Sequence, residues 1–155
     1  MQLFLLRHAN ADTVAAHDDD RPLSDRGVSQ AQRIARFCEA HDVVPKLILT
    51  SPVRRAHQTA KLVSEHLRVD MKIVHWLACG AQPAVVLNAV QEYEAHQSVM
   101  LVGHEPDFSQ IAAYLVGTVK SDAFHIRKGT LSQFEVFDFG HGGGRLEFSL
   151  PPRLM

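Results

Sequence analysis

Short runs of consecutive apolar residues recur along the chain, and each run ends in polar or charged residues. The clearest of them lie within Leu3–Leu6, Lys46–Thr50 and Ser98–Val102, with a weaker one at Met71–Trp76. Runs this short are typical of strands that are covered on both faces, as in a parallel sheet. We therefore expect parallel strands at these positions.

Between these runs, apolar residues recur with the spacing of a helix. The serine side chains at the first two starts would cap their helices, and Pro52 would take the first helical position of the second. The alternation of strands and helices predicts a parallel sheet with helices on both faces. The helices are expected from Ser24 to about Ala40, Ser51 to about Leu67, Pro83 to about Glu94 and Pro106 to near Gly117.

The last part of the chain changes to strands without intervening helices. We expect strands at Phe124–Arg127, Thr130–Phe137 and Arg145–Leu150, which would join the sheet as antiparallel edge strands. The predicted fold class is therefore α/β, with a mostly parallel central sheet flanked by helices on both faces. The length of 155 residues predicts a single domain over residues 1–155.

Charge and composition exclude several classes of function. The formal net charge is −1, so no general positive field favours nucleic acid or a membrane surface as a partner. No apolar run is long enough to span a bilayer, and we see no signal peptide. Cys38 and Cys79 suggest neither a disulfide framework nor a metal site, which favours a reducing cytoplasmic location. Although the chain has ten histidines, none forms a helical H-E-x-x-H pair, so we expect no metal and no cofactor.

Cations and histidines follow three of the predicted strands. Arg7 and His8 come directly after the first, Arg55 lies shortly after the second, and His104 follows the fourth. Because ligands bind at the carboxyl ends of strands in open α/β sheets, we expect these side chains to meet at one edge. We expect Arg54, beside Arg55, to lie on the surface.

Two or three arginines beside two histidines suit the chemistry of a phosphoryl group. Guanidinium forks match phosphate oxygens, and one close pair of unit charges contributes about 4 kcal/mol at an effective dielectric of 20, before desolvation. The same positive charge lowers the pKa of a nearby imidazole and keeps it neutral at pH 7. A neutral imidazole can attack phosphorus and form a covalent phosphohistidine, which water then hydrolyses.

Four segments resemble motifs of the histidine phosphatase superfamily, which is also called phosphoglycerate mutase-like. Arg7-His8-Ala9 is similar to its Arg-His-Gly motif, and residues 51–59 are similar to its S-P-x-x-R-A-x-Q-T segment. Residues 22–27 resemble its turn before the first helix, and residues 103–106 resemble its G-H-x-P segment. The short chain, Arg21 and the loop at Cys79 and Gly80 are most similar to the SixA phosphohistidine phosphatase branch.

The resemblance implies a role for each of the clustered residues. His8 would be the phosphorylated nucleophile, with Arg7 and Arg55 as the phosphate clamps. His104 would be the second imidazole of the phosphate pocket, and Arg21 a further phosphate contact.

This sequence departs from the family pattern in two places. Ala9 replaces the family glycine, and a Cβ there would be costly if the backbone needed a positive φ. The loop Leu77–Gln82 has no carboxylate, although many members carry an acidic general acid after the third strand. Asp18 and Glu105 are the candidate general acids that remain.

The expected function is a phosphohistidine phosphatase that acts on a partner protein, through a phosphohistidine intermediate on His8. The partner would be a histidine phosphotransfer domain or a phosphotransferase-system carrier. A P–N bond is more labile than an ester and needs less help from an acid, and the short loop before Pro83 predicts an open site. Two alternatives stay open: a phosphomonoesterase for small phosphorylated metabolites, and a weakly active phosphoprotein-binding module, for which Ala9 is the reason.

Overall fold

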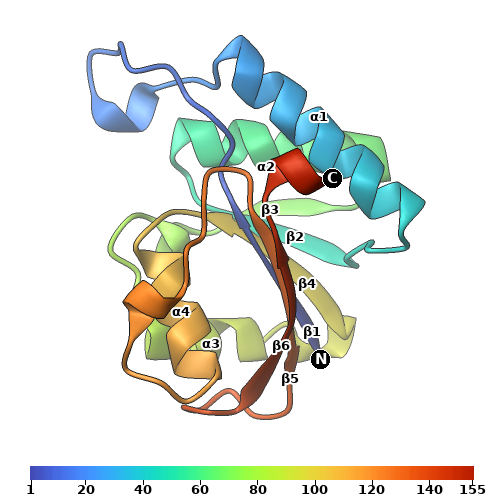
Figure 1. The fold of residues 1–155 in the computed structure, drawn as a ribbon, viewed down its shortest axis with the longest axis vertical. Coiled ribbons are helices and arrows are strands. Elements are labelled where there is room, and N and C mark those ends of the chain that lie inside the picture. Colours follow the sequence, from blue (N-terminus) through green and yellow to red (C-terminus); the bar gives the residue numbers. More distant parts are fainter.

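The computed structural model describes all 155 residues and has a six-stranded sheet at its centre, in the order β3-β2-β4-β1-β5-β6 (Figure 1). The neighbours β1 with β4, β4 with β2 and β2 with β3 run parallel, while β5 is antiparallel to β1 and to β6. The α/β class and the antiparallel edge are therefore confirmed. The strands are β1 (Gln2–Arg7), β2 (Leu47–Thr50), β3 (Met71–Ile73), β4 (Ser98–Gly103), β5 (Leu131–Val136) and β6 (Gly144–Leu150).

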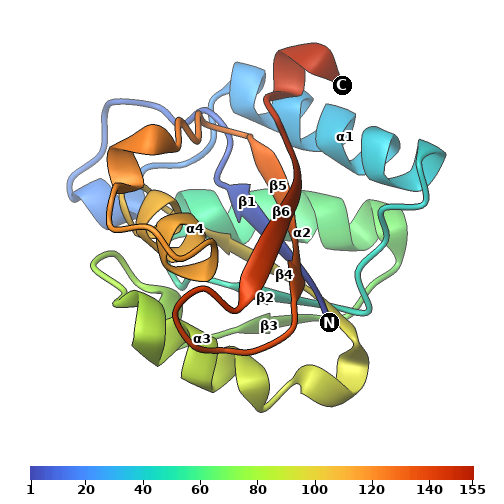
Figure 2. The same ribbon diagram turned by 60° about the horizontal axis from the view of Figure 1, so that its bottom comes forward.

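Helices cover both faces of the sheet, as Figures 1 and 2 show. Alternate residues of β1 separate the two halves of the core, because successive side chains of a strand point to opposite faces. Phe4 and Leu6 pack with α1 and α2, whereas Leu3 and Leu5 pack with α3 and α4. All four side chains are buried, which stabilises the fold by about 1.5–3 kcal/mol for each. The helices are α1 (Asp25–Ala40), α2 (Arg54–Leu67), α3 (Pro83–Gln91) and α4 (Asp107–Leu115).

The two predicted serine caps have different outcomes. The cap of α1 is confirmed, because the Ser24 hydroxyl accepts a hydrogen bond from the backbone N–H of Gly27 at 3.2 Å. The predicted start of α2 is wrong: the helix begins at Arg54, and Val53 is its N-cap residue. The Ser51 hydroxyl instead accepts from the backbone N–H of Val53 and is held in a turn before the helix.

The predicted strand at Phe124–Arg127 is absent, and a 3₁₀ turn at Ser121–Ala123 leads into irregular chain. Side chains contact the backbone carbonyls of this segment that would otherwise accept hydrogen bonds from a neighbouring strand. Arg7 donates to the Ile126 carbonyl and the Ser109 hydroxyl lies 3.1 Å from the Phe124 carbonyl, so the segment is held without a neighbouring strand.

Two elements are shorter than their patterns predict. The strand β3 ends at Ile73 instead of Trp76, because the chain turns into a 3₁₀ helix at His75–Leu77 that buries Leu77. The helix α3 ends at Gln91, and a 3₁₀ turn at Glu94–His96 follows. None of the helices has the length and apolar character needed to cross a membrane.

Candidate active site

Hydrogen bonds between strands bring the polar strand ends to one edge of the sheet. Arg7 is opposite Gly103 in the register of β1 and β4, and the His8 N–H donates to the Gly103 carbonyl at 3.0 Å. The Ser51 N–H, directly after β2, donates to the Val102 carbonyl at 3.0 Å. His8, Arg55 and His104 thus meet at this edge, where the sequence places them.

His8 is held in one tautomer by its surroundings. Its Nδ1 lies 2.8 Å from the Ala9 carbonyl, and because a carbonyl only accepts, Nδ1 carries the proton. The lone pair is therefore on Nε2, to which Arg55 Nε donates at 3.3 Å. Burial, with help from the charges of the neighbouring arginines, lowers the pKa of His8 to about 3. His8 is thus a neutral imidazole whose Nε2 electron pair accepts from Arg55, and this hydrogen bond must break before Nε2 can bond to an incoming group.

His104 is the second buried imidazole, and its ring centre lies 5.2 Å from that of His8. Its Nε2 lies 2.9 Å from the Ser51 hydroxyl, whereas its Nδ1 is buried without a partner. The Ser51 hydroxyl contacts no other acceptor for its proton, which favours donation to Nε2 and leaves Nδ1 as the N–H donor. Burial and the charge of Arg55 lower the pKa of His104 to about 4. His104 can therefore donate a hydrogen bond without carrying charge.

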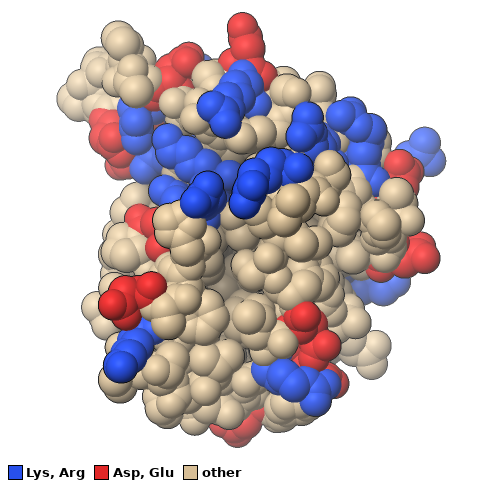
Figure 3. All heavy atoms as spheres, in the orientation of Figure 1, with Lys and Arg blue, Asp and Glu red and all other residues tan.

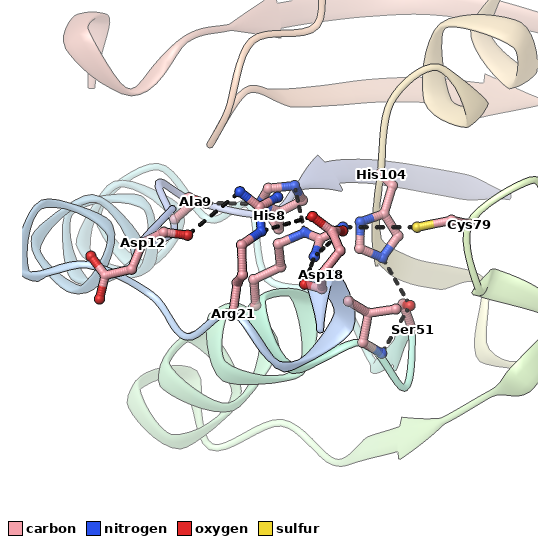
Figure 4. Close-up of polar contacts among 10 residues, drawn as sticks. His8, Ala9, Asp12, Asp18, Arg21, Ser51, Cys79 and His104 are labelled. Atoms are coloured by element: carbon pink, nitrogen blue, oxygen red, sulfur yellow. Dashed lines mark hydrogen bonds and ion pairs between the residues drawn. The ribbon is translucent and has the colours of Figure 1, made fainter. Parts of the chain in front are cut away.

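Asp18 lies close to His8 and His104 (Figure 4), and its carboxylate pairs with Arg55. The Arg55 side chain is 6 % exposed, and its Nη1 contacts both the Asp18 carbonyl at 2.9 Å and the Asp18 carboxylate at 3.1 Å. The other oxygen of that carboxylate lies 2.9 Å from Arg21 Nε. The Asp18 side chain is 66 % exposed. A carboxylate on an exposed turn thus bridges two arginines beside the nucleophile.

Arg7 and Glu105 lie on the other side of the strand ends. Arg7 Nη1 donates to the Ile126 carbonyl at 2.8 Å, and its Nε is buried without a partner. One Glu105 oxygen accepts from the Ser109 hydroxyl at 2.6 Å, while the other is buried without a partner. Burial raises the pKa of Glu105, and the charge of Arg7 opposes that rise. Arg7 therefore has an N–H free for a ligand oxygen.

Comparison with known proteins shows the family to which this chain belongs. The model of the histidine phosphatase superfamily (branch 1) matches residues 3–78. The phosphohistidine phosphatase SixA of Escherichia coli is 31% identical over 121 residues, which cover 75% of this chain and 72% of that protein. The chain belongs to the histidine phosphatase superfamily, in its SixA-like branch. It is a phosphatase of that superfamily.

Solved structures agree with the family in their fold. A putative phosphohistidine phosphatase SixA from Agrobacterium tumefaciens superimposes with a TM-score of 0.84 at 27% identity, and covers 97% of both chains. A protein histidine phosphatase SixA in complex with tungstate superimposes with a TM-score of 0.88 at 23% identity, and covers 99% of both chains. The SixA-like fold thus extends over nearly the whole chain.

Ala9, which stands where the superfamily has glycine, fits without strain. It is not among the residues with positive φ, which are Asp42, Arg68 and Gln97 apart from glycines. Its side chain is fully buried and packs in a small apolar cluster with Leu23 and Ala31. The reason for expecting weak activity from Ala9 through backbone strain is therefore removed.

The roles of three residues within the quoted motif at residues 51–59 escaped the sequence analysis. Thr59 accepts from the Ala9 N–H at 3.1 Å, and Gln58 accepts from the Leu23 N–H at 2.8 Å. Both lie one helical turn beyond Arg55, which could have identified them as its neighbours on α2. Ser51 was predicted only as a helix cap, yet its hydroxyl orients His104.

Gly27 lies in the first turn of α1, where the neighbouring backbone comes too close for a side chain. A Cβ at this position would lie 1.8 Å from the Asn10 carbonyl oxygen, so only glycine allows α1 to approach this backbone. The approach is reinforced by the Ser24 hydroxyl, which donates to the Asn10 side chain at 2.8 Å. These contacts thus fix the backbone at Asn10, two residues after His8.

The loop at Cys79 lies beside Arg55 and is tied to the start of α4. Asp107 at the start of α4 accepts hydrogen bonds from the N–H groups of Gly80 and Ala81 at 2.9 and 3.1 Å, which ties the loop down. Cys79 Sγ lies 3.9 Å from Arg55 Nη2 and is the nearest side chain of the loop to that guanidinium in the hydrogen-bond network. No group of three or more potential metal ligands is assembled anywhere in the chain.

Proposed function

We propose that this phosphatase removes the phosphoryl group from a phosphorylated histidine on a partner protein, with His8 as the covalent intermediate. The observation that carries the proposal is the state of His8: a buried, neutral imidazole whose Nε2 lone pair faces the Arg55 guanidinium. The SixA relatives are named as phosphohistidine phosphatases, and this supports the same substrate class here.

In the first step, His8 Nε2 attacks phosphorus and the bond from phosphorus to the partner's imidazole nitrogen breaks. The leaving imidazole takes up a proton, so it departs neutral. In the second step, water attacks the phosphorus on His8, and inorganic phosphate leaves while His8 regains its lone pair. Both steps are catalysed mainly by positioning and charge neutralisation, as in other phosphoryl transfers.

The surrounding residues are assigned as phosphate contacts in this proposal. Arg55 would exchange its contact with Asp18 for the phosphoryl oxygens, and His104 would donate to them from its unpartnered Nδ1. Arg7 would use its free Nε in the same way. Arg21, which reaches the site through Asp18, would act as a further contact once phosphate displaces that carboxylate.

Both candidate general acids, Asp18 and Glu105, are engaged in contacts with other side chains. The Asp18 carboxylate pairs with Arg21 and Arg55. Glu105 has a raised pKa but is held by Ser109 beside Arg7. A phosphohistidine is the substrate that depends least on a strong acid, because its imidazole leaves readily once solvent has protonated it. The absence of a placed acid thus favours phosphohistidine over phosphate esters.

The partner is proposed to be a histidine phosphotransfer domain or a phosphotransferase-system carrier. Both present the phosphohistidine on a folded surface, and the short loop before Pro83 supports a site that can accept it. Both classes of partner belong to the cytoplasm, where we place this chain as well.

A phosphomonoesterase acting on small metabolites is the second candidate, because the two arginines and His104 would bind the phosphate of an ester equally well. The test is turnover of a phosphorylated histidine phosphotransfer domain, compared with p-nitrophenyl phosphate and sugar phosphates. We expect a higher kcat/KM for the phosphoprotein than for the esters. We expect His8→Ala to have no activity toward the phosphoprotein. A preference for the esters would make the chain a metabolite phosphatase. Tungstate binding without turnover of any substrate would make it a phosphoprotein-binding module.

A further inference from the structure

A groove of about 630 Å³ opens beside the site and shares Arg7 with it. It follows one side of α1 and ends at the 3₁₀ turn Pro152–Leu154. Its walls contain no Asp or Glu, no Phe, Tyr or Trp, and no apolar residue other than two prolines. We call it the basic groove, after its six cationic side chains: Arg7, Arg26, Arg33, Arg127, Lys128 and Arg153.

The positive charge of the basic groove is not neutralised within the chain. None of the six cations takes part in an ion pair, although the chain has such pairs elsewhere. Burial and then the charges of Arg7 and Arg21 lower the pKa of Lys128, as expected where cations crowd together. In the orientation of Figure 1, Lys and Arg atoms form a band across the molecule beside α1 (Figure 3). In a chain of net charge −1, this concentration on one face calls for an anionic ligand.

The spacing along α1 indicates an extended ligand. Arg26 and Arg33 are two helical turns apart and both exposed, with Ser29 and Gln30 between them on the same side. At 1.5 Å per residue, the two arginines are separated by about 10 Å along the helix axis. Carboxylates two turns apart on a partner's helix have the same spacing.

The chemistry of the walls favours a protein over a nucleotide or a sugar phosphate. The groove has no Phe, Tyr or Trp on which a base could stack, and its only apolar side chains are two prolines. Its side chains are suited mainly to anionic and hydrogen-bonding groups. When a phosphohistidine on a folded partner reaches His8, the partner's surface around that histidine comes close to this chain. The basic groove begins next to His8, at Arg7.

We propose that the basic groove docks an acidic face of the partner protein, next to the phosphohistidine that reacts at His8. This inference rests on the proposed function and extends it from the reacting group to the surface around it. The groove attracts and orients the phosphoprotein before transfer, and a small substrate that lacks this surface gains nothing from it. Charges of this kind act mainly on the rate of association, and salt weakens them.

The test compares two substrates that share the P–N bond: a phosphorylated histidine phosphotransfer domain, and free phosphohistidine. The variant is Arg26→Gln with Arg33→Gln, because glutamine preserves helix propensity while removing charge. The matched control is Arg36→Gln with Lys61→Gln, which removes the same charge from exposed positions outside the groove. Each protein is assayed at low and at high salt.

We expect the groove variant to raise KM for the phosphoprotein about tenfold at low salt, with kcat little changed. Its KM for free phosphohistidine should stay the same, the control should match the unchanged chain, and high salt should remove the difference. Equal effects of the two double variants would overturn the docking role, and so would an equal rise in KM for free phosphohistidine, which would indicate a small-molecule subsite. Failure of the unchanged chain to dephosphorylate any phosphohistidine protein is a different result, and it would overturn the proposed function together with this inference.

Discussion

Arginines in two neighbouring regions of this molecule are held in opposite ways. Arg55, beside His8, is buried, and each of its three nitrogens contacts another group of the chain. Arg26 and Arg33 in the basic groove are exposed and have no ion pair. Arg7 belongs to both regions, because it ends β1 beside His8 and also lines the groove.

The difference separates chemistry from recognition. A buried, fully bonded guanidinium has a fixed direction, as a group must have to stabilise charge during a reaction. Exposed and unpaired guanidinium groups act over a longer range and adapt to the surface that they meet, but salt screens them. Substitutions in the pocket should therefore affect every substrate, whereas those in the groove should affect only a protein substrate.

The largest effect is expected from Arg55→Lys. Lysine keeps the charge but loses the planar fork that reaches His8, Asp18 and the phosphoryl oxygens. We expect kcat to fall about 10²–10³-fold for both phosphohistidine and p-nitrophenyl phosphate. The control is Arg54→Lys, because its neighbour Arg54 contacts only the Asp20 carbonyl in an exposed position. Similar activities of the two variants would contradict the role given to Arg55.

A pH effect on stability should come from the two buried imidazoles. The pKa values of His8 and His104, about 3 and about 4, lie below the ordinary histidine pKa of 6.5. As pH falls below 6.5 the unfolded chain binds protons first, so the free energy of unfolding should fall between pH 6.5 and about 3. Denaturant unfolding across this range should show a shallower fall in His104→Gln than in the unchanged chain. Identical slopes would mean that His104 is not held neutral.

Gly27→Ala tests the backbone contact beneath the pocket. The new Cβ would collide with the Asn10 carbonyl oxygen, so α1 and the chain after His8 must move apart. We expect a loss of about 1–3 kcal/mol in unfolding free energy, measured by denaturant titration. Gln32→Ala, at an exposed position of the same helix, serves as the control. Unchanged stability of Gly27→Ala would show that this approach is not tight.

The smallest effect is expected from Asp18→Asn. The substitution removes the carboxylate that competes with phosphate for Arg55 and Arg21, so tungstate should bind a few-fold more tightly. Calorimetric titration measures the affinity, with Asp19→Asn as a control of equal charge. If Asp18 is instead the general acid, kcat for phenyl phosphate should fall without tighter tungstate binding.

The sequence predicts the site better than it predicts the element boundaries. Arg7, His8 and His104 could be placed because apolar runs identify the strands, and parallel strands deliver their ends to one edge. The role of Ser51 could not be predicted, since its hydroxyl is equally suited to a helix cap and to a histidine partner. The segment Phe124–Arg127 has the pattern of a strand but no neighbour to pair with. Its carbonyls are taken by side chains from remote parts of the chain, which no local pattern reveals.

The basic groove also lies beyond sequence reasoning. Its cations come from β1, α1, the segment before β5 and the last residues of the chain, and no run of basic residues marks them. The net charge of −1 suggests the opposite of a strongly positive surface. Only the packing of the C-terminal turn on α1, where Arg33 donates to the Pro152 carbonyl, brings these side chains together.

The most direct test of the account is to trap the phosphoryl group on the enzyme. The chain is mixed with a phosphorylated histidine phosphotransfer domain, quenched with alkali within one turnover, and mapped by peptide mass spectrometry, with His8→Ala treated in the same way. The account predicts a phosphoryl group on His8 that appears and decays at rates that fit turnover, and none in His8→Ala. Turnover with no phosphoryl group on His8, or with equal labelling of another histidine, would contradict it.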